Sequence, residues 1–391
     1  MSLIHNIISS FKYEIVEIAK NRVYLTTLIV LPFVTLLFFG TMFHSGSIEN
    51  LPIIAIDNDH SSTSRQMLQM VDATRGIEIS RQVSSTIEAN KVLKSGKAYA
   101  LLFIPEGLER NVYRGTATNI ECYISCTNLS ASGIIESDIA SSVRTFAAGI
   151  ELSKLKSQGV NEHIAMQEVM PINILTHTIS NPYLNYGYYL APIFIFLAIG
   201  LFSTLLTTYA IGRELYYATV TRWLSVANNS TIGAIIGKLS PITISMIVYS
   251  QLSLFTIFRV MGLECAGSYV YLSIGAIVFI VAHQSIALLI TTISANMRLG
   301  LSLGGGYSVM AFTFSGITFP AIAMFRAIQP ITSLFPLTWF TEIFIDQAMR
   351  GAPIEYSIKP LATLTLFLLL PLLTARRLQR ILSNSQYWSR D

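Results

Sequence analysis

Five long segments of this chain contain no aspartate, glutamate, lysine or arginine. They are residues 23–43, 183–212, 239–258, 266–297 and 299–325. A bilayer core needs about 20 apolar residues per helix, because it holds no water to satisfy free backbone groups. A sixth run, 360–375, is shorter, but Lys359 and Arg376 can reach the membrane surface from its ends. The sequence therefore predicts six transmembrane helices.

The composition supports a membrane protein and excludes several other classes. Of the 391 residues, 52% are hydrophobic and only 12% are charged, whereas about a quarter are charged in soluble domains. A soluble enzyme, a disordered chain and a nucleic-acid binder are therefore not expected. The charged residues are concentrated in residues 44–182, which hold 25 of the 48. This segment is predicted to be a water-exposed domain inserted between the first two helices.

Basic residues near the ends of the six runs predict the orientation. One side of the membrane would collect eleven of them: Lys12, Lys20, Arg22, Arg213, Arg222, Lys238, Arg298, Arg376, Arg377, Arg380 and Arg390. The short loops on the other side hold only Arg259, Arg326, Arg350 and Lys359. Basic residues favour the cytoplasmic side. Both termini, including the tail at 378–391, are therefore predicted to be cytoplasmic, and the 44–182 domain to face outward.

Residues 1–22 have the pattern of an amphipathic helix. One face is predicted to carry apolar residues, namely Ile4, Ile8, Phe11, Ile15 and Ile18, and the other Lys12, Glu14 and Glu17. Such a helix either lies in the inner membrane interface or packs on protein, and both interpretations stay open. The apolar run at 23–43 has no cleavage site after it, so it is expected to remain as an anchor.

The 44–182 segment alternates between short apolar stretches and polar amphipathic ones. Residues 52–57, 77–81, 98–104 and 120–125 are predicted strands, and residues 62–73, 84–95 and 130–158 are predicted helices. Asp59 or Ser61, and Ser84, are the expected N-caps. This alternation indicates an inserted α/β domain.

No catalytic or metal-binding pattern stands out in the domain. Asp57 and Asp59 end a strand, but Asp-Asn-Asp followed by serines is also ordinary turn and cap chemistry. The histidines lack metal-ligand spacing. Cys122 and Cys126 are expected to be buried thiols, because four residues along a strand span about 13 Å, too far for a bridge. Cys265 is isolated in a short outer loop.

Two stretches of the membrane part resemble the permeases of ABC-2 type transporters. Residues Arg213-Glu214 through Thr219 and Arg222-Trp223, followed by Gly237-Lys238, resemble the family pattern R-E-x-E-x-G-T-x-E-x-L with a later G-K. Ala218, Tyr216 and Thr221 depart from this pattern. A closer similarity lies near the C-terminus, where the S-G-x-x-x-P, P-L-T-x-F and R-G-A motifs have counterparts. These are Ser315-Gly316 with Pro320, then Pro336-Leu337-Thr338, and finally Arg350-Gly351-Ala352.

A third stretch resembles a particular subgroup of these permeases. Residues Asp57-Asn-Asp59 with Ser61, Ser64 and Arg65 are similar to the start of the outer domain in bacterial exporters that have a large first loop. The resemblance implies an inner-membrane chain that pairs with a second permease chain, identical or different, and that works with separate ATP-binding subunits. An adaptor protein in the periplasm is a further partner that it suggests.

The chain itself lacks the loop that binds nucleotide phosphates. The nearest stretch, 233–238, is one residue short between its glycines and has Leu239 after the lysine. ATP and Mg²⁺ are therefore expected on the partner subunit, and no cofactor, metal or catalytic residue in this chain. The loop at 213–229 is predicted to couple to that subunit through Arg213, Glu214, Thr219, Arg222 and Trp223. Anchoring of Arg222 and Trp223 in the membrane interface is the alternative.

The outer end of the bundle and its interior complete the prediction. Three prolines, Pro320, Pro330 and Pro336, divide the apolar stretch 320–352, and Pro353 follows it. Short re-entrant helices are therefore expected there to cap the pathway. The absence of charges inside the runs disfavours ion-coupled transport. Possible lining residues are aromatic, namely Phe202, Tyr209, Phe312 and Phe314. An exporter of hydrophobic or amphipathic compounds fits such walls, and a non-transporting receptor of the phage-infection type on the same scaffold is the alternative.

Overall fold

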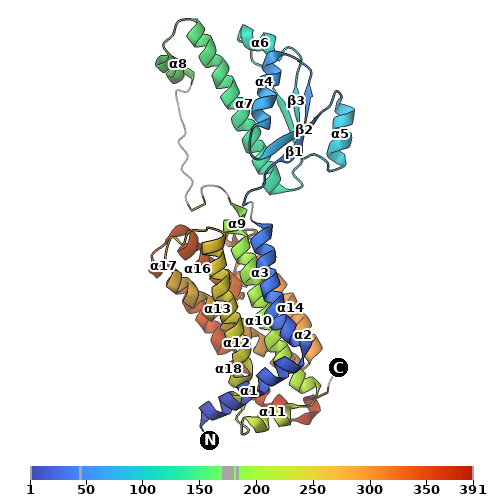
Figure 1. The fold of residues 1–391 in the computed structure, drawn as a ribbon, viewed down its shortest axis with the longest axis vertical. Coiled ribbons are helices and arrows are strands. Elements are labelled where there is room, and N and C mark those ends of the chain that lie inside the picture. The colour runs from blue at the N-terminus through green and yellow to red at the C-terminus, as the bar shows by residue number, and fades with distance from the viewer. Residues whose placement is uncertain (1, 44–45, 170–179, 182–184, 390–391) are drawn as a thin grey trace. The chain divides into compact units, whose positions relative to one another are not determined.

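The computed structural model describes residues 2–43, 46–169, 180–181 and 185–389. The chain forms two compact units, which are described separately here (Figure 1). One unit joins Met1–Gly46 to Thr178–Asp391 and is helical, and the other is Ser47–His177. The second unit corresponds to the predicted domain at 44–182, of which residues 44, 45, 170–179 and 182–184 lie outside the description.

The helical unit is built around α10 (Ala191–Tyr216), which packs against α12 (Thr231–Phe255), α13 (Tyr269–Ser294) and α14 (Met297–Phe314). The first span consists of α2 (Arg22–Leu25), the π-helix η1 (Thr26–Val30) and α3 (Leu31–Met42). The last consists of α17 (Ile354–Leu366), the 3-10 turn η5 (Phe367–Leu369) and α18 (Leu370–Ser383). The shorter α9 (Tyr186–Tyr189), η2 (Thr256–Val260) and η6 (Ser385–Tyr387) flank these helices.

Among the described residues, five helical stretches are long and apolar enough to cross a membrane. They are Arg22–Met42, Tyr186–Tyr216, Thr231–Val260, Tyr269–Ser294 and Ile354–Ser383. Six had been expected, and the difference lies in the run at 299–325. Its helix, α14, ends at Phe314, because Gly316 adopts a left-handed conformation with φ +82° and Pro320 follows. The span at 299–325, the fifth of the six, therefore remains a prediction.

Small residues let α14 approach α10 closely. A Cβ atom on Gly300 would lie 3.0 Å from the Thr208 methyl carbon, and one on Gly304 would lie 3.1 Å from that of Thr204. Glycines at this four-residue spacing allow two helix backbones to pack at short range. The glycine-rich start of α14 thus makes a close helix contact with α10.

Short helical segments follow α14, as the prolines predicted. They are η3 (Ala321–Ala323), α15 (Gln329–Thr332), α16 (Pro336–Phe344) and the π-helix η4 (Ile345–Arg350). The apolar stripe of α16 and η4 is fully buried, at Leu337, Phe340, Ile343, Phe344 and Ala348. This burial fixes α16 against α13 and α17.

The second unit is a four-stranded sheet with the order β2-β1-β3-β4. Its strands are β1 (Leu51–Asp57), β2 (Ile77–Gln82), β3 (Ala100–Ile104) and β4 (Glu121–Ile124), each within two residues of the predicted bounds. β1 pairs in parallel with β2 and β3, with Ile53 opposite Ile79 and Ala100, and β3 pairs antiparallel with β4. The sheet separates two apolar cores.

Five helices accompany this sheet (Figure 1). They are α4 (Ser62–Asp72), α5 (Thr86–Lys94), α6 (Leu108–Arg114), α7 (Leu129–Ser157) and α8 (Glu162–Val169). α4 and α7 contribute to the core on one face, and α5 to the core on the other. Ser61 caps α4 as predicted, whereas Ser85, and not Ser84, caps α5. α6 was not predicted, because seven residues are too few to show a helical pattern.

The two aspartates after β1 have the structural role that was expected of them. Asp57 accepts hydrogen bonds from the amides of Asp59 and His60, and Asp59 from the amides of Gly107 and Glu109. Although partial burial alone raises the pKa of Asp59, its hydrogen bonds outweigh this effect and lower it. These carboxylates therefore fix the turns around β1 and the start of α6.

Cys122 and Cys126 differ from the expectation of buried thiols, because both residues are exposed and unbridged. The reason is that β4 is an edge strand, covered poorly on both faces. Burial nevertheless reaches the Cys122 thiol and raises its pKa to about 11, with a smaller contribution from the charge of Glu136.

Candidate functional site

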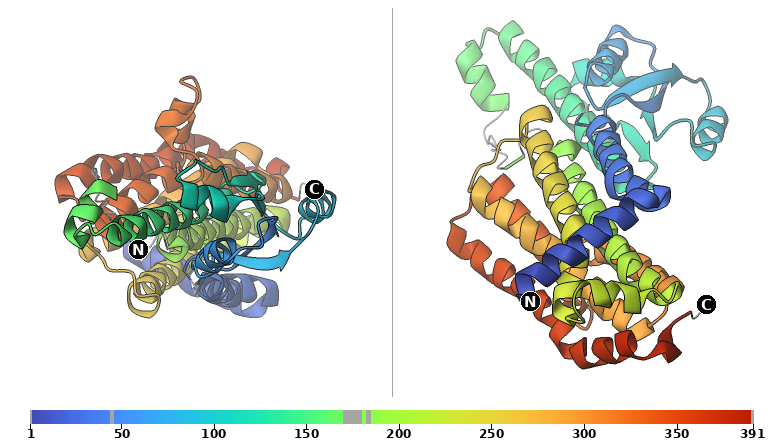
Figure 2. Two further views of the ribbon diagram at one scale, coloured as in Figure 1. Left: turned by 90° about the horizontal axis from the view of Figure 1, so that it is seen from above. Right: turned by 60° about the horizontal axis from the view of Figure 1, so that its bottom comes forward.

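The N-terminal helix α1 (Leu3–Lys20) lies crosswise at one end of the helical unit and packs on α12 and on α11 (Val220–Val226) (Figure 2). The face that it buries is mostly polar: Asn6, Ser10, Glu14, Glu17 and Ile18. Three isoleucines of the opposite face are exposed, Ile4 by 68%, Ile8 by 48% and Ile15 by 44%. A helix on the surface of a soluble protein would bury its isoleucines and expose its polar face. Ile18, predicted with the apolar face, is instead buried.

Two glycines of α12 form the groove in which α1 lies. A Cβ atom on Gly237 would lie 2.3 Å from the carbonyl oxygen of Ile7, and one on Gly233 would lie 2.9 Å from the Asn6 side chain. The Ser10 hydroxyl donates a 2.8 Å hydrogen bond to the carbonyl of Ala234 between them. The stretch 233–238, the nearest approach to a nucleotide loop in the sequence, is thus a helix-packing groove.

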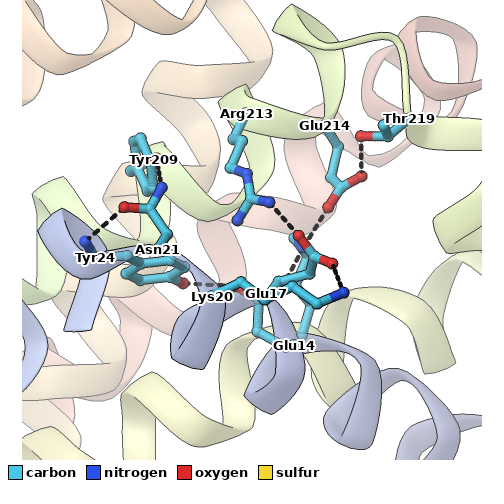
Figure 3. Close-up of polar contacts among 10 residues, drawn as sticks. Glu14, Glu17, Lys20, Asn21, Tyr24, Tyr209, Arg213, Glu214 and Thr219 are labelled. Carbon is cyan, nitrogen blue, oxygen red and sulfur yellow. Dashed lines mark hydrogen bonds and ion pairs between the residues drawn. The ribbon is translucent and has the colours of Figure 1, made fainter.

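Lys238 lies directly after this groove and joins three helices. Its ammonium forms ion pairs with Glu14 of α1 and with Glu214 at the end of α10, 2.7 Å away (Figure 3 draws the two glutamates). All three side chains are only 1% exposed. The hydroxyls of Tyr24 and Thr219 donate to Glu14 and Glu214, at 2.6 and 2.5 Å. Buried charges need such pairing and hydrogen bonding, so this cluster fixes α1, α10 and α12 together.

A second ion pair links the same helices beside the first. Arg213 of α10 pairs with Glu17 of α1, and Lys20 lies 3.6 Å from the same carboxylate (Figure 3). Partial burial alone raises the pKa of Glu17, but the hydrogen bond and charge of Arg213 outweigh it, so this pKa lies below its usual 4.5. Glu17 is therefore charged at neutral pH.

The short helix α11 is attached to this assembly by its tryptophan. Trp223 is fully buried, donates a 3.1 Å hydrogen bond to Ser10, and has its ring 5.1 Å from the Lys238 nitrogen. Arg222 is exposed, with its guanidinium 5.8 Å from the centre of the Tyr13 ring. Burial, together with the charges of Glu214 and Glu17, raises the pKa of Tyr13 to about 12. One side of α11 thus faces the protein, and the other carries Arg222.

The predicted coupling residues therefore divide into three groups. Glu214 and Trp223 are interior, Arg213 and Thr219 are occupied by contacts within the chain, and only Arg222 is exposed. Their partners in α1 and α12 were not identified from the sequence. A usable signal existed, because Glu14 and Glu17 lie on one face of α1 and Lys238 follows two glycines four residues apart.

The four aromatic residues suggested as pathway lining have different surroundings. Phe202 is buried in the core. The Tyr209 hydroxyl accepts a 2.7 Å hydrogen bond from Asn21 near the charged cluster (Figure 3). Phe312 stacks on Phe194 with ring centres 5.0 Å apart, and Phe314 stacks on Phe335 at 5.4 Å. Their role in transport remains a prediction.

The motif residues at the opposite end of the bundle come together around the end of α14. The Ser315 hydroxyl donates to the carbonyl of Phe312, and the Thr338 hydroxyl donates to that of Phe314 at 3.1 Å. Gly316 makes the left-handed turn, Pro320 precedes η3, Pro336 begins α16, and Leu337 is fully buried. The two motifs thus stabilise one turn, although 15 residues separate Pro320 from Pro336 and the chain between them is only partly helical.

Comparison with known families decides what kind of membrane protein this is. The model of the ABC-2 family transporter proteins matches residues 22–376, nearly the whole chain. The chain belongs to the ABC-2 family of transporter permeases. No curated protein and no solved structure matches it. The match begins at residue 22, so α1 lies outside it.

Membership of this family defines the protein in general terms. ABC-2 permeases are membrane components of transporters and are not themselves catalytic, and they typically work with an ATP-binding subunit. The charged cluster described above joins α1 to the part of the chain that the family model covers. It is the candidate site at which such a subunit would act on the bundle.

Proposed function

We propose that this chain is the permease subunit of an ATP-driven exporter, which moves a hydrophobic or amphipathic compound outward across a bacterial inner membrane. A separate subunit binds ATP and Mg²⁺, and a second permease chain, identical or different, completes the membrane part. Family membership and the uncharged interior of the spans support this proposal. Both termini are cytoplasmic in this arrangement, which places α1 and α11 on the side where ATP is available.

The exposed side of α11 is the proposed dock for the ATP-binding subunit. Arg222 and Ser225 are exposed there, while Val220 and Trp223 are buried on the other side of the same helix. A partner that displaces Arg222 must also move Trp223, which donates a hydrogen bond to Ser10 of α1. Because Lys238 and Arg213 link α1 to α10 and α12, the displacement reaches two spans as a rigid-body motion. This anchored α11 is the observation that carries the proposal.

The exposed isoleucines of α1 support its placement in the inner membrane interface. Ile4, Ile8 and Ile15 are apolar and face away from the protein, and such a face is stable only against lipid or another apolar surface. Lipid beneath the isoleucines and protein against the glutamates satisfy both sides of the helix at once. In this placement the isoleucine face of α1 lies in the membrane interface, and the glutamate face packs on protein.

The unit at Ser47–His177 is proposed to face outward, where it either receives the exported compound or docks a periplasmic adaptor protein. Two exposed thiols and a concentration of charged residues suit an aqueous environment. Nucleic acid is not a proposed partner, because the net charge is only +4.

The dock is tested by reversing one exposed charge. Arg222→Glu should abolish stimulation of the partner's ATPase by the assembled complex and stop export, while the chain stays in the membrane at normal amounts. Arg380→Glu is the matched control, because Arg380 is also exposed but lies on a different helix, α18. Unchanged coupling in Arg222→Glu would remove the proposed role of this side of α11.

A further inference from the structure

An apolar cavity of about 590 Å³ lies within the helical unit, between α3 and the segment formed by α12 and η2. On α3 its lining extends from Phe33 to Phe43, about 15 Å along the helix axis. Leu252, Thr256 and Val260 form the opposite wall. The volume is within the usual range for small-molecule sites, about 300–1,000 Å³, and the shape is elongated.

The cavity opens toward the surface that faces lipid. Phe33, Leu37, Leu252 and Val260 line it and are also strongly exposed, between 40% and 71%. Its lining includes no charged side chain. The hydroxyls of Thr41 and Thr256 donate to carbonyls of their own helices, so they place no demand on an occupant. The long part of the cavity therefore suits an uncharged hydrocarbon chain that enters sideways from the bilayer.

One end of the cavity is polar. A Cβ atom on Gly187 would lie 2.9 Å from the Asn185 Oδ1, 3.1 Å from the Phe43 carbonyl oxygen and 3.6 Å from the Met261 methyl carbon, so these residues meet at this end. Asn185 Oδ1 accepts hydrogen bonds from the amides of Gly187 and Tyr188. Its amide nitrogen has no acceptor among the residues described and lies beside Gly46, where a Cβ atom would be 2.5 Å away from it.

An aromatic stack connects this site to the rest of the bundle. Phe43 lines the cavity and stacks on Phe194 at 6.2 Å, and Phe194 stacks on Phe312 of α14 at 5.0 Å. The opposite wall contains the π-helix η2, an irregularity that is frequent at functional sites. An occupant of the cavity would thus contact the aromatic stack through Phe43 and the π-helix η2 through Thr256 and Val260.

We propose that this cavity binds one alkyl chain, with the hydrogen-bond-accepting head of the molecule at Asn185. The chain can belong to a single-chain amphiphile or to a bilayer phospholipid, since the chemistry of the cavity is common to both. The proposal goes beyond the proposed function, because it requires only that the protein lies in a membrane. Binding to the cavity is measured by photolabelling and not by export. The cavity proposal and the exporter proposal can therefore fail independently.

The test uses the full-length chain in lipid nanodiscs and two photoreactive probes. One is palmitic acid with a diazirine in its chain, and the other is a phosphatidylethanolamine that carries the same acyl group. Cross-linked peptides are identified by mass spectrometry. Labelling within 33–43 and 252–261 by both probes assigns the site to bilayer lipid as well as to free amphiphile, and labelling by palmitic acid alone assigns it to the free amphiphile. Either result supports the proposal.

Two variants and a control make the test specific. Gly40→Phe should occupy part of the cavity, since Gly40 lines it and a Cβ atom there meets nothing within 4 Å, and should reduce labelling by about tenfold or more. Asn185→Asp keeps the acceptor for Gly187 and Tyr188 but replaces the donor with a negative charge, so palmitic acid labelling should fall by about tenfold. Val34→Phe adds bulk to α3 at an exposed position outside the lining and should leave labelling unchanged. No labelling of either segment, or labelling that Gly40→Phe leaves unchanged, would overturn the proposal.

Discussion

Lys238 on α12 lies 2.7 Å from Glu214 on α10, and the same ammonium also pairs with Glu14 of the N-terminal helix. One lysine therefore holds together three helices that are distant in the sequence. Two carboxylates share this cation, and the hydroxyls of Tyr24 and Thr219 complete the hydrogen bonding. The packing of α1 on α12 should therefore depend on the pairing of Lys238 with the two carboxylates more than on any single apolar residue.

Removal of the lysine is expected to be severe. Lys238→Met leaves Glu14 and Glu214 buried without a cation, and breaking a buried pair in this way costs about 3–5 kcal/mol. Thermal unfolding of the purified chain should show a large loss of stability. Glu214→Gln together with Lys238→Met should recover part of it, because one of the two unpaired charges is removed. Equal stability of Lys238→Met and the wild type would contradict the claim that Lys238 neutralises the two buried glutamates.

A glycine substitution tests the contact between α1 and α12. Replacing glycine by alanine inside a helix normally stabilises it by about 1 kcal/mol. Gly237→Ala should instead destabilise the protein by about 1–3 kcal/mol, because the new Cβ atom would lie 2.3 Å from the Ile7 carbonyl. Gly40→Ala is the control, since its surroundings are open. Chemical unfolding of the two variants should therefore give changes of opposite sign.

The ion pair of Glu17 and Arg213 predicts a defined pH dependence. The pKa of Glu17 is lowered below 4.5 in the folded protein, so its contribution to stability is present above that pH and is lost as the pH falls through the lowered pKa. The wild type should unfold at a higher temperature than Glu17→Gln, with a gap that stays constant from about pH 8 to 5 and closes only below 4.5. A gap that already closes near neutral pH would indicate a different titrating group.

The two exposed cysteines test the orientation. In whole cells, a membrane-impermeant maleimide should label Cys126 in the Ser47–His177 unit and fail to label a cysteine introduced at Arg222 in a variant without the native cysteines. Cys122 should react more slowly than Cys126, because burial raises the pKa of its thiol to about 11. Labelling at position 222 but not at 126 would invert the proposed topology.

Local patterns in the sequence predicted the parts of the fold that depend on local interactions. The four strands, the N-cap of α4 and the short helices after Pro320 all follow from residues close in the chain. The periodicity of α1 likewise predicted two faces. It could not decide which face the protein covers, because the partners Arg213 and Lys238 are about two hundred residues away and appear in the pattern only as isolated charges.

The same limitation explains the incomplete prediction of the candidate site. The family resemblance drew attention to 213–229, but it does not show which of these side chains a partner can reach, and Trp223 and Glu214 are buried. Their burial depends on α1, which precedes the segment that the family model covers. The span at 299–325 was overestimated in length because this run contains no charge, although a turn at Gly316 divides it.

The central claim is that α11 presents its exposed side to an ATP-binding subunit while α1 holds the other side. It is tested most directly by purifying the tagged full-length chain from its native membranes after cross-linking through a cysteine at position 225. We expect a stoichiometric partner that carries the G-x-x-x-x-G-K-[ST] loop, cross-linked from 225 and not from a cysteine placed at 380. An intact, folded chain that reproducibly yields no such partner, or a partner cross-linked only from 380, would contradict the claim.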